Sequence, residues 1–158
     1  MGDFLIAFDV TRFDDFYRRL RRRLANWLAS DDGRRHRWAD VLCVAPDLLH
    51  LMVRLLLDAR VPSLAKSRLM AALVYFVSPL DALPEAVLGP AGYLDDVALA
   101  AFVLDGLLNH VDPAVLRQHW AGRGDVLEVI RRLVANADDM IGSGLWHRLR
   151  RRFAGGQG

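Results

Sequence analysis

The middle of this sequence has no cations. Between Arg68 and Arg117 there is no Lys or Arg, and two stretches of that region, 69–80 and 97–104, contain no charged residue at all. A helix that is apolar on every side has to be buried, either in a protein core or in lipid. We therefore expect residues 69–111 to form a central antiparallel helical hairpin, with the other helices packed around it.

Arginine-rich segments flank this hairpin on both sides. Residues 12–29 predict an amphipathic helix, because apolar residues such as Leu20 and Leu24 recur at helical spacing while arginines fill the remaining positions. Residues 145–153 predict a second basic amphipathic helix, which follows a glycine-rich hinge at 142–144. The chain is thus predicted to carry its positive charge at its two ends.

The rest of the chain also follows helical patterns. We expect a turn at 30–35 and then a helix over 38–59, which Pro46 would kink or restart. A short helix capped by Asp112 and a longer one from Asp125 to about residue 140 should follow the hairpin. The pattern predicts an all-α fold, a compact bundle of about six helices in a single domain, 1–158, with the parts 12–60, 62–111 and 113–153.

Composition indicates a folded chain with a sizeable core. Of the 158 residues, 53% are hydrophobic, which is above the usual range for globular proteins. Cys43 is the only cysteine, so no intramolecular disulfide can form, and we expect it to be a buried thiol in a reducing cytoplasm. Asp3 stands where a signal peptide would carry basic residues. We therefore expect a cytoplasmic protein, located at the inner face of the cell membrane.

The arginines are candidates for contact with an anionic membrane surface. In a helix that lies on lipid, the apolar face enters the bilayer and the arginines reach the headgroup phosphates. We expect Phe13, Phe16, Trp27 and Trp146 to act as anchors. The alternative is an ordinary solvated face with ion pairs along the helix. The predicted lipid contacts are Arg18, Arg19, Arg21, Arg22, Arg23, Arg148, Arg150, Arg151 and Arg152.

The apolar segments themselves are short for membrane-spanning helices. A spanning helix needs roughly 20 apolar residues, whereas 12 residues separate Arg68 from Asp81 and Asp105 interrupts the second segment. Three arrangements remain open from the sequence: a soluble core wrapped by the amphipathic helices, a shallow or conditional insertion, and full insertion. Basic flanks on both sides of the hairpin agree with a cytoplasmic location of those flanks.

Residues 72–108 resemble the YkvA-like family, domain of unknown function 1232. The resemblance rests on an apolar helix, an S-P-x-D-x-x-P element, and a G-Y-x-D-D element that opens a second apolar helix. Glu85 stands where the family often has Asp. The resemblance implies a helical fold and membrane association in a largely uncharacterised bacterial family, and it implies no reaction. The matching residues are Ser78, Pro79, Asp81, Pro84, Gly92, Tyr93, Asp95 and Asp96.

Four carboxylates of this motif would converge if the two apolar helices pair. Asp81, Glu85, Asp95 and Asp96 could then bind a divalent cation, since hard cations prefer several oxygen ligands. The simpler interpretation is helix capping or buried hydrogen bonding, because acids at a helix N-terminus satisfy unpaired N–H groups. Acid/base catalysis is a third alternative. No cofactor is predicted apart from this divalent cation.

The sequence contains no motif that names a reaction. It has no Walker loop, no G-x-S-x-G elbow and no zinc-ligand spacing among its five histidines. We therefore predict no catalytic residues and expect a membrane-associated interaction or structural module. The alternative is a divalent-cation-binding protein or enzyme that uses Asp81, Asp95 and Asp96. Partners are expected to be anionic membrane or protein. Nucleic acid is disfavoured because the aromatic residues lie on the apolar faces.

Overall fold

The computed structural model describes residues 10–35, 37–82 and 94–154, and every regular element in these ranges is an α-helix. This confirms the predicted all-α fold. The helices are α2 (Val10–Ala29), α3 (Asp31–Arg35), α4 (Ala39–Leu42), α5 (Ala45–Leu56), α6 (Ser63–Ala82), α8 (Leu94–Leu107), α9 (Pro113–His119), α10 (Val126–Ala135), α11 (Ala137–Ile141) and α12 (Ser143–Ala154).

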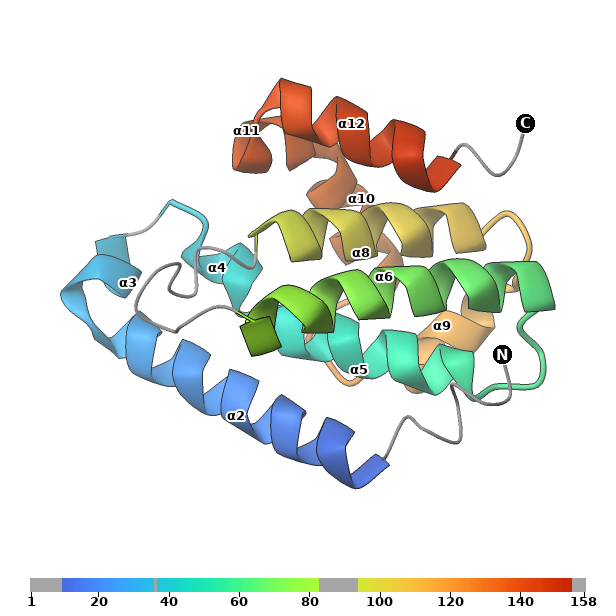
Figure 1. Ribbon diagram of the computed structural model, residues 1–158, viewed down its shortest axis with the longest axis horizontal. Coiled ribbons are helices and arrows are strands. Elements are labelled where there is room, and N and C mark those ends of the chain that lie inside the picture. The colour runs from blue at the N-terminus through green and yellow to red at the C-terminus, as the bar shows by residue number, and fades with distance from the viewer. Residues whose placement is uncertain (1–9, 36, 83–93, 155–158) are drawn as a thin grey trace.

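Helix α8 lies at the centre of the bundle. It contacts α4, α5, α6, α10, α11 and α12, and it runs beside α6 in the opposite direction (Figure 1). Each side chain from Val97 to Ala101 is no more than 1% exposed. Small and branched apolar side chains allow this close approach from several sides, because none of them carries a polar group that would need water. Asp105, in the last turns of α8, is exposed.

Helix α5 forms the second half of the core. It lies between α2, α6, α8 and α9, and its fully buried side chains include Leu48, Met52 and Leu55. Pro46 occupies the first turn of α5, where its missing N–H has no helical partner to lose. A new helix begins at Ala45, so the helix expected over 38–59 is divided into α4 and α5, and of the two alternatives at Pro46 the structure has the restart.

The helix caps at Asp112 and Asp125 are those that the sequence predicts. The Asp112 carboxylate accepts a hydrogen bond from the Ala114 N–H at 2.9 Å and begins α9. The Asp125 carboxylate accepts one from the Leu127 N–H at 3.2 Å and begins α10. Both bonds satisfy backbone donors that a helix leaves unpaired in its first turn.

Several local expectations were wrong. Residues 31–35 form helix α3 instead of a turn, and Cys43 is exposed because it lies at the end of the short helix α4. The helix expected to run from Asp125 to about residue 140 breaks at Asn136 into α10 and α11. At Gly142, with φ of 88°, α11 ends and the chain turns directly into α12.

The lengths and compositions of the helices also bear on membranes. Among the described residues, no helix combines the length and the apolar content that a bilayer-crossing helix requires. Helix α6 carries two exposed apolar side chains, Leu64 at 58% and Val74 at 43%. The part of α6 that faces α8 is buried, with Leu69 and Leu73 no more than 1% exposed.

Candidate functional site

The backbone brings most of the predicted acidic motif to one end of the bundle. Ser78, Pro79 and Asp81 lie in the last turns of α6, and Asp95 and Asp96 lie in the first turn of α8. Since α6 and α8 run in opposite directions, these two helix ends lie at the same side of the molecule (Figure 1).

The side chains of the predicted acidic motif lie outside the part of the chain that the structure describes. Pro84, Glu85, Gly92 and Tyr93 fall in the stretch 83–93, and the side chains of the acids at the two helix ends are likewise not described. Among the side chains that are described, no group of three or more His, Cys, Asp or Glu residues could hold a metal ion. The cation hypothesis for the motif therefore stays a prediction.

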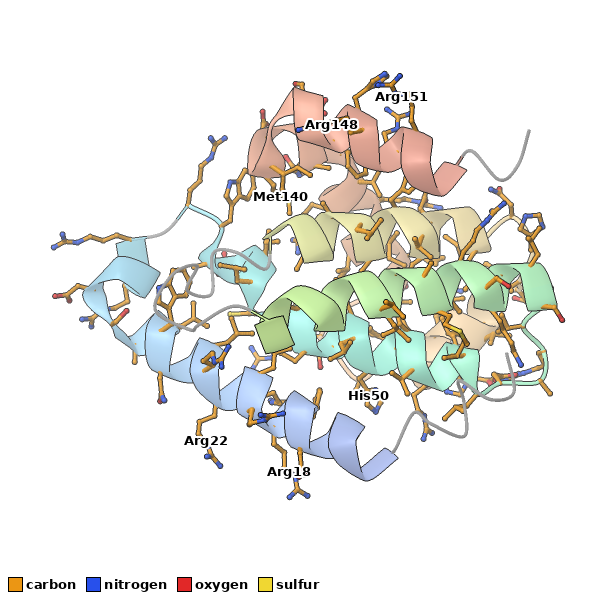
Figure 2. The ribbon with its side chains drawn as sticks, viewed as in Figure 1. Arg18, Arg22, His50, Met140, Arg148 and Arg151 are labelled. Carbon is orange, nitrogen blue, oxygen red and sulfur yellow. The ribbon has the colours of Figure 1, made fainter. Side chains whose placement is uncertain are left out.

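The N-terminal basic face is well defined. Leu20 and Leu24 of α2 are 2% and 3% exposed and pack in the core against α5. The opposite side of α2 carries exposed arginines, of which Arg18 and Arg22 point away from the bundle (Figure 2). We call the exposed arginine side chains of this helix the α2 face: Arg18, Arg19, Arg21 and Arg22.

A polar seam holds α2 against α5. The Arg21 guanidinium donates a hydrogen bond of 2.8 Å to the Tyr17 hydroxyl and lies over the Tyr17 ring. The Tyr17 ring lies 5.9 Å from the His50 ring of α5. Burial raises the pKa of Asp47 above its usual value, while Arg21 and His50 act in the opposite direction. The seam fixes the rotation of α2, and with it the direction of the arginines.

The C-terminal basic face is built in the same way. Trp146 of α12 is only 5% exposed and meets the Phe102 ring of α8 edge-on, with the ring centroids 5.6 Å apart. The exposed arginines of α12 form what we call the α12 face: Arg148, Arg150 and Arg151. Arg151 points away from the bundle (Figure 2), Arg148 is exposed, and the side chain of Arg152 lies outside the described part of the chain.

These observations correct the prediction of aromatic anchors. Trp146 cannot act as a lipid anchor in this structure because it fills a position in the core. Trp27 is half-buried and packs against the same core. The side chains of Phe13 and Phe16 are not described. The described large apolar side chains of both basic helices are thus buried or half-buried, and their arginines lie among the exposed residues.

The two basic faces lie on opposite sides of the molecule. Helix α2 packs on α5, α5 packs on α8, and α8 packs on α12, which places the core between the two faces. In Figure 2, Arg18 and Arg22 extend from one edge of the bundle, and Arg151 extends from the opposite edge. Lipid contact through both basic segments stays a prediction, and one flat surface would meet only one face at a time.

In the part of the chain that the structure describes, three arginines elsewhere form ion pairs, whereas most arginines of the α2 and α12 faces do not. Arg34 pairs with Asp31, Arg60 with Asp58, and Arg117 with Asp125. Within 10–35, 37–82 and 94–154, the arginines that have no ion-pair partner include Arg18, Arg19, Arg22, Arg148 and Arg151. Their guanidinium groups keep all five N–H donors available for an external anion.

A polar cluster that the sequence did not predict joins the α5–α6 connection to α9. Asp58 accepts hydrogen bonds from Arg60, and its Oδ2 lies 2.7 Å from Nε2 of His119. Arg60 also donates to the side chain of Gln118 at 2.8 Å. Arg60 and His119 hold the pKa of Asp58 well below its usual range. The two contacts with α9, Arg60–Gln118 and Asp58–His119, join residues 58 and 61 positions apart in sequence, so no local pattern could have indicated them.

Comparisons with known proteins agree with the central segment. The family model described as "Protein of unknown function (DUF1232)" matches residues 65–102. An uncharacterized protein, ORF9, of Methanothermobacter thermautotrophicus is 27% identical over 96 residues, which cover 61% of this chain and 66% of that relative. No solved structure matches. The resemblance inferred over the central helices is confirmed for this segment.

Proposed function

We propose that this all-α chain, which carries the segment of unknown function at its centre, is a peripheral membrane-binding module without catalytic activity. It would contact anionic lipid headgroups at the inner face of the cell membrane through its outward-facing arginines. The observation that carries the proposal is the set of exposed arginines on α2 and α12 that have no ion-pair partner among the described residues. A bilayer that contains anionic lipid supplies the phosphates that such groups recognise.

The burial of Leu20, Leu24 and Trp146 indicates how the contact would be made. An amphipathic helix that enters lipid has to expose its apolar face, and here that face would first have to leave the core. Removing a buried Leu or Trp side chain from a core costs several kcal/mol. We therefore propose an electrostatic contact with the headgroups, in which the bundle stays folded and no helix enters the acyl chains.

The magnitude of such a contact can be estimated. Each Arg near an anionic membrane contributes about 1 kcal/mol. The four arginines of the α2 face would thus supply roughly 4 kcal/mol, which corresponds to a Kd of about 1 mM. Binding of this strength would be reversible and sensitive to salt, because the Debye length shortens from about 10 Å at 0.1 M to about 3 Å at 1 M salt.

A flotation experiment tests the proposal. The protein is mixed with phosphatidylcholine vesicles that contain increasing fractions of phosphatidylglycerol, at low and high salt. We expect the floated fraction to rise with phosphatidylglycerol content and to fall with salt. A floated fraction that changes neither with phosphatidylglycerol content nor with salt would overturn the proposal.

Matched variants identify the surface responsible. One variant replaces Arg18, Arg19 and Arg22 by Gln, a second replaces Arg148, Arg150 and Arg151, and a third combines all six changes. A control replaces three exposed arginines elsewhere, Arg54, Arg123 and Arg131, so that it loses the same charge as each single-face variant. We expect the six-fold variant to lose flotation and the control to keep it.

A further inference from the structure

We infer that one molecule of this protein can bind two anionic lipid surfaces at the same time, one through the α2 face and one through the α12 face. The inference rests on the proposed function and goes beyond it. Binding alone needs one basic face, whereas the structure presents two on opposite sides of one folded core (Figure 2).

The spacing of the helices separates the two faces. Axes of packed helices lie about 8–10 Å apart, and three successive contacts, α2 on α5, α5 on α8 and α8 on α12, lead from one face to the other. The three steps add up to a path of roughly 24–30 Å between the axes of α2 and α12, and the arginine side chains extend outward from these axes. This path exceeds the Debye length of about 8 Å at physiological salt. Each face therefore acts on its own surroundings and barely senses the charge of the other.

The same spacing prevents both faces from contacting one flat bilayer. When the α2 face lies on a membrane, the α12 face points into solution with its arginines still available (Figure 2). The resulting surface-bound molecule presents a second basic patch to any anionic surface that approaches. A second vesicle would be attracted to a patch that the first vesicle cannot reach.

Charges near each face support this view. The described side chains of α2 include one exposed acid, Asp15, against the four arginines of the face. Helix α12 contains no acid, and His147 is exposed beside its arginines. The nearest exposed acids along the chain are Asp138 and Asp139 of α11, at the end of α12 away from Arg151 (Figure 1). Both faces thus keep a local excess of positive charge.

Lipid fits these faces better than single-stranded nucleic acid does. Proteins that bind single strands commonly stack bases on exposed aromatic rings. Here Trp146 is buried beneath the α12 face, and the Tyr17 ring is engaged by Arg21 and packed near His50. Headgroup phosphates need only the guanidinium groups, which both faces offer.

Vesicle aggregation tests the inference. Vesicles with 30% phosphatidylglycerol are mixed with the protein, and their hydrodynamic size is followed by dynamic light scattering. We expect size to increase at low protein-to-lipid ratios. It should fall again when excess protein covers every vesicle, because separate molecules then occupy the surfaces that one molecule would bridge.

The variants defined above distinguish bridging from binding. Each single-face variant should still float with vesicles but should leave their size at the value without protein, and the Arg54, Arg123 and Arg131 control should aggregate them like the wild type. Aggregation by either single-face variant at the wild-type level would overturn the inference. Size-exclusion chromatography of the same samples checks that no variant has unfolded or formed dimers.

Failure of the inference and failure of the proposed function give different results. If the wild-type protein floats with anionic vesicles but never enlarges them, the inference is wrong and the proposed function stands. If the protein does not float, both are wrong. Loss of flotation on adding an equal phosphate concentration of duplex DNA, with stable DNA complexes in its place, would assign the faces to nucleic acid and overturn the inference.

Discussion

At the scale of single residues, Asp58 contributes to stability through one neighbour, Arg60, and one residue that is distant in sequence, His119. Its side chain is 10% exposed and forms ion pairs with both Arg60 and His119. These two pairs join the segment between α5 and α6 to the C-terminal end of α9. Hydrogen bonds to cations are about twice as strong as neutral ones. We therefore regard this cluster as the main polar tie between α9 and the rest of the bundle.

The low pKa of Asp58 predicts a specific pH dependence. A carboxylate whose pKa is depressed in the folded state stabilises the protein fully at pH values above its ordinary pKa of 3.8. This stabilisation is lost as the pH falls from 3.8 toward the pKa of the folded state. We expect Asp58→Asn to lower Tm at pH 6 and the difference from wild type to shrink between pH 4 and pH 2. Circular dichroism melts over this range provide the measurement.

The exposed pair of Asp31 and Arg34 provides the control for Asp58. Its side chains are 77% and 66% exposed, and exposed pairs contribute little to stability. Asp31→Asn should therefore leave Tm nearly unchanged at every pH. A constant difference between Asp58→Asn and wild type at all pH values would contradict the assigned role of the carboxylate charge.

At the scale of elements, the basic helices have the same design. Each has apolar side chains in the core and arginines on the outside. Packing of α2 on α5 and of α12 on α8 determines which side of each helix is buried. Helix α3 adds a constraint that the sequence did not reveal. Its Gly33 is buried against the C-terminal end of α2, where a Cβ atom would lie 1.9 Å from the Trp27 carbonyl oxygen.

This contact predicts opposite effects for two glycine substitutions. Gly33→Ala should destabilise the protein by about 1–3 kcal/mol, because backbone atoms would have to move apart. Gly106→Ala should stabilise it by about 0.5–1 kcal/mol, since Gly106 lies within α8 and nothing lies within 4 Å of its added Cβ. Urea unfolding of both variants checks the signs. A stabilising Gly33→Ala would show that α3 does not pack on α2 in this way.

At the scale of the whole molecule, the bundle places its most apolar helix at the centre and its cations at two outer edges (Figure 1). The folded protein thus offers charge to a membrane, while Trp146 is buried and Trp27, Trp38 and Trp120 are packed in part against the core. Tryptophan fluorescence can therefore distinguish binding at the membrane surface from insertion into the bilayer.

We predict that vesicle binding leaves the tryptophans away from the acyl chains. Of the four tryptophans, Trp146 is 5% exposed, and Trp27, Trp38 and Trp120 are half-buried against the core. Lipids brominated in their acyl chains should therefore not quench the emission of the bound protein. Free protein and protein bound to unbrominated vesicles serve as references. Strong quenching by bromines near the bilayer centre would indicate that the helices leave the core and insert.

Local sequence patterns alone determined several of the helices and two of their N-terminal caps. Apolar periodicity predicts α2 and α12, Pro46 predicts the beginning of α5, and Asp112 and Asp125 predict two N-termini. These features depend on residues within one or two helical turns of each other, so they can be recognised without knowledge of the fold.

Only the tertiary structure decided what those helices face. An apolar stripe indicates that one side of a helix is buried, but it does not identify the partner that buries it. Packing against α5 and α8 directed the two sets of arginines to opposite sides, and it placed Trp146 in the core and Cys43 at the surface. The pairing of Asp58 with His119 likewise depends on how α9 folds back on α5. Such contacts join distant residues, and packing of the whole bundle selects among them.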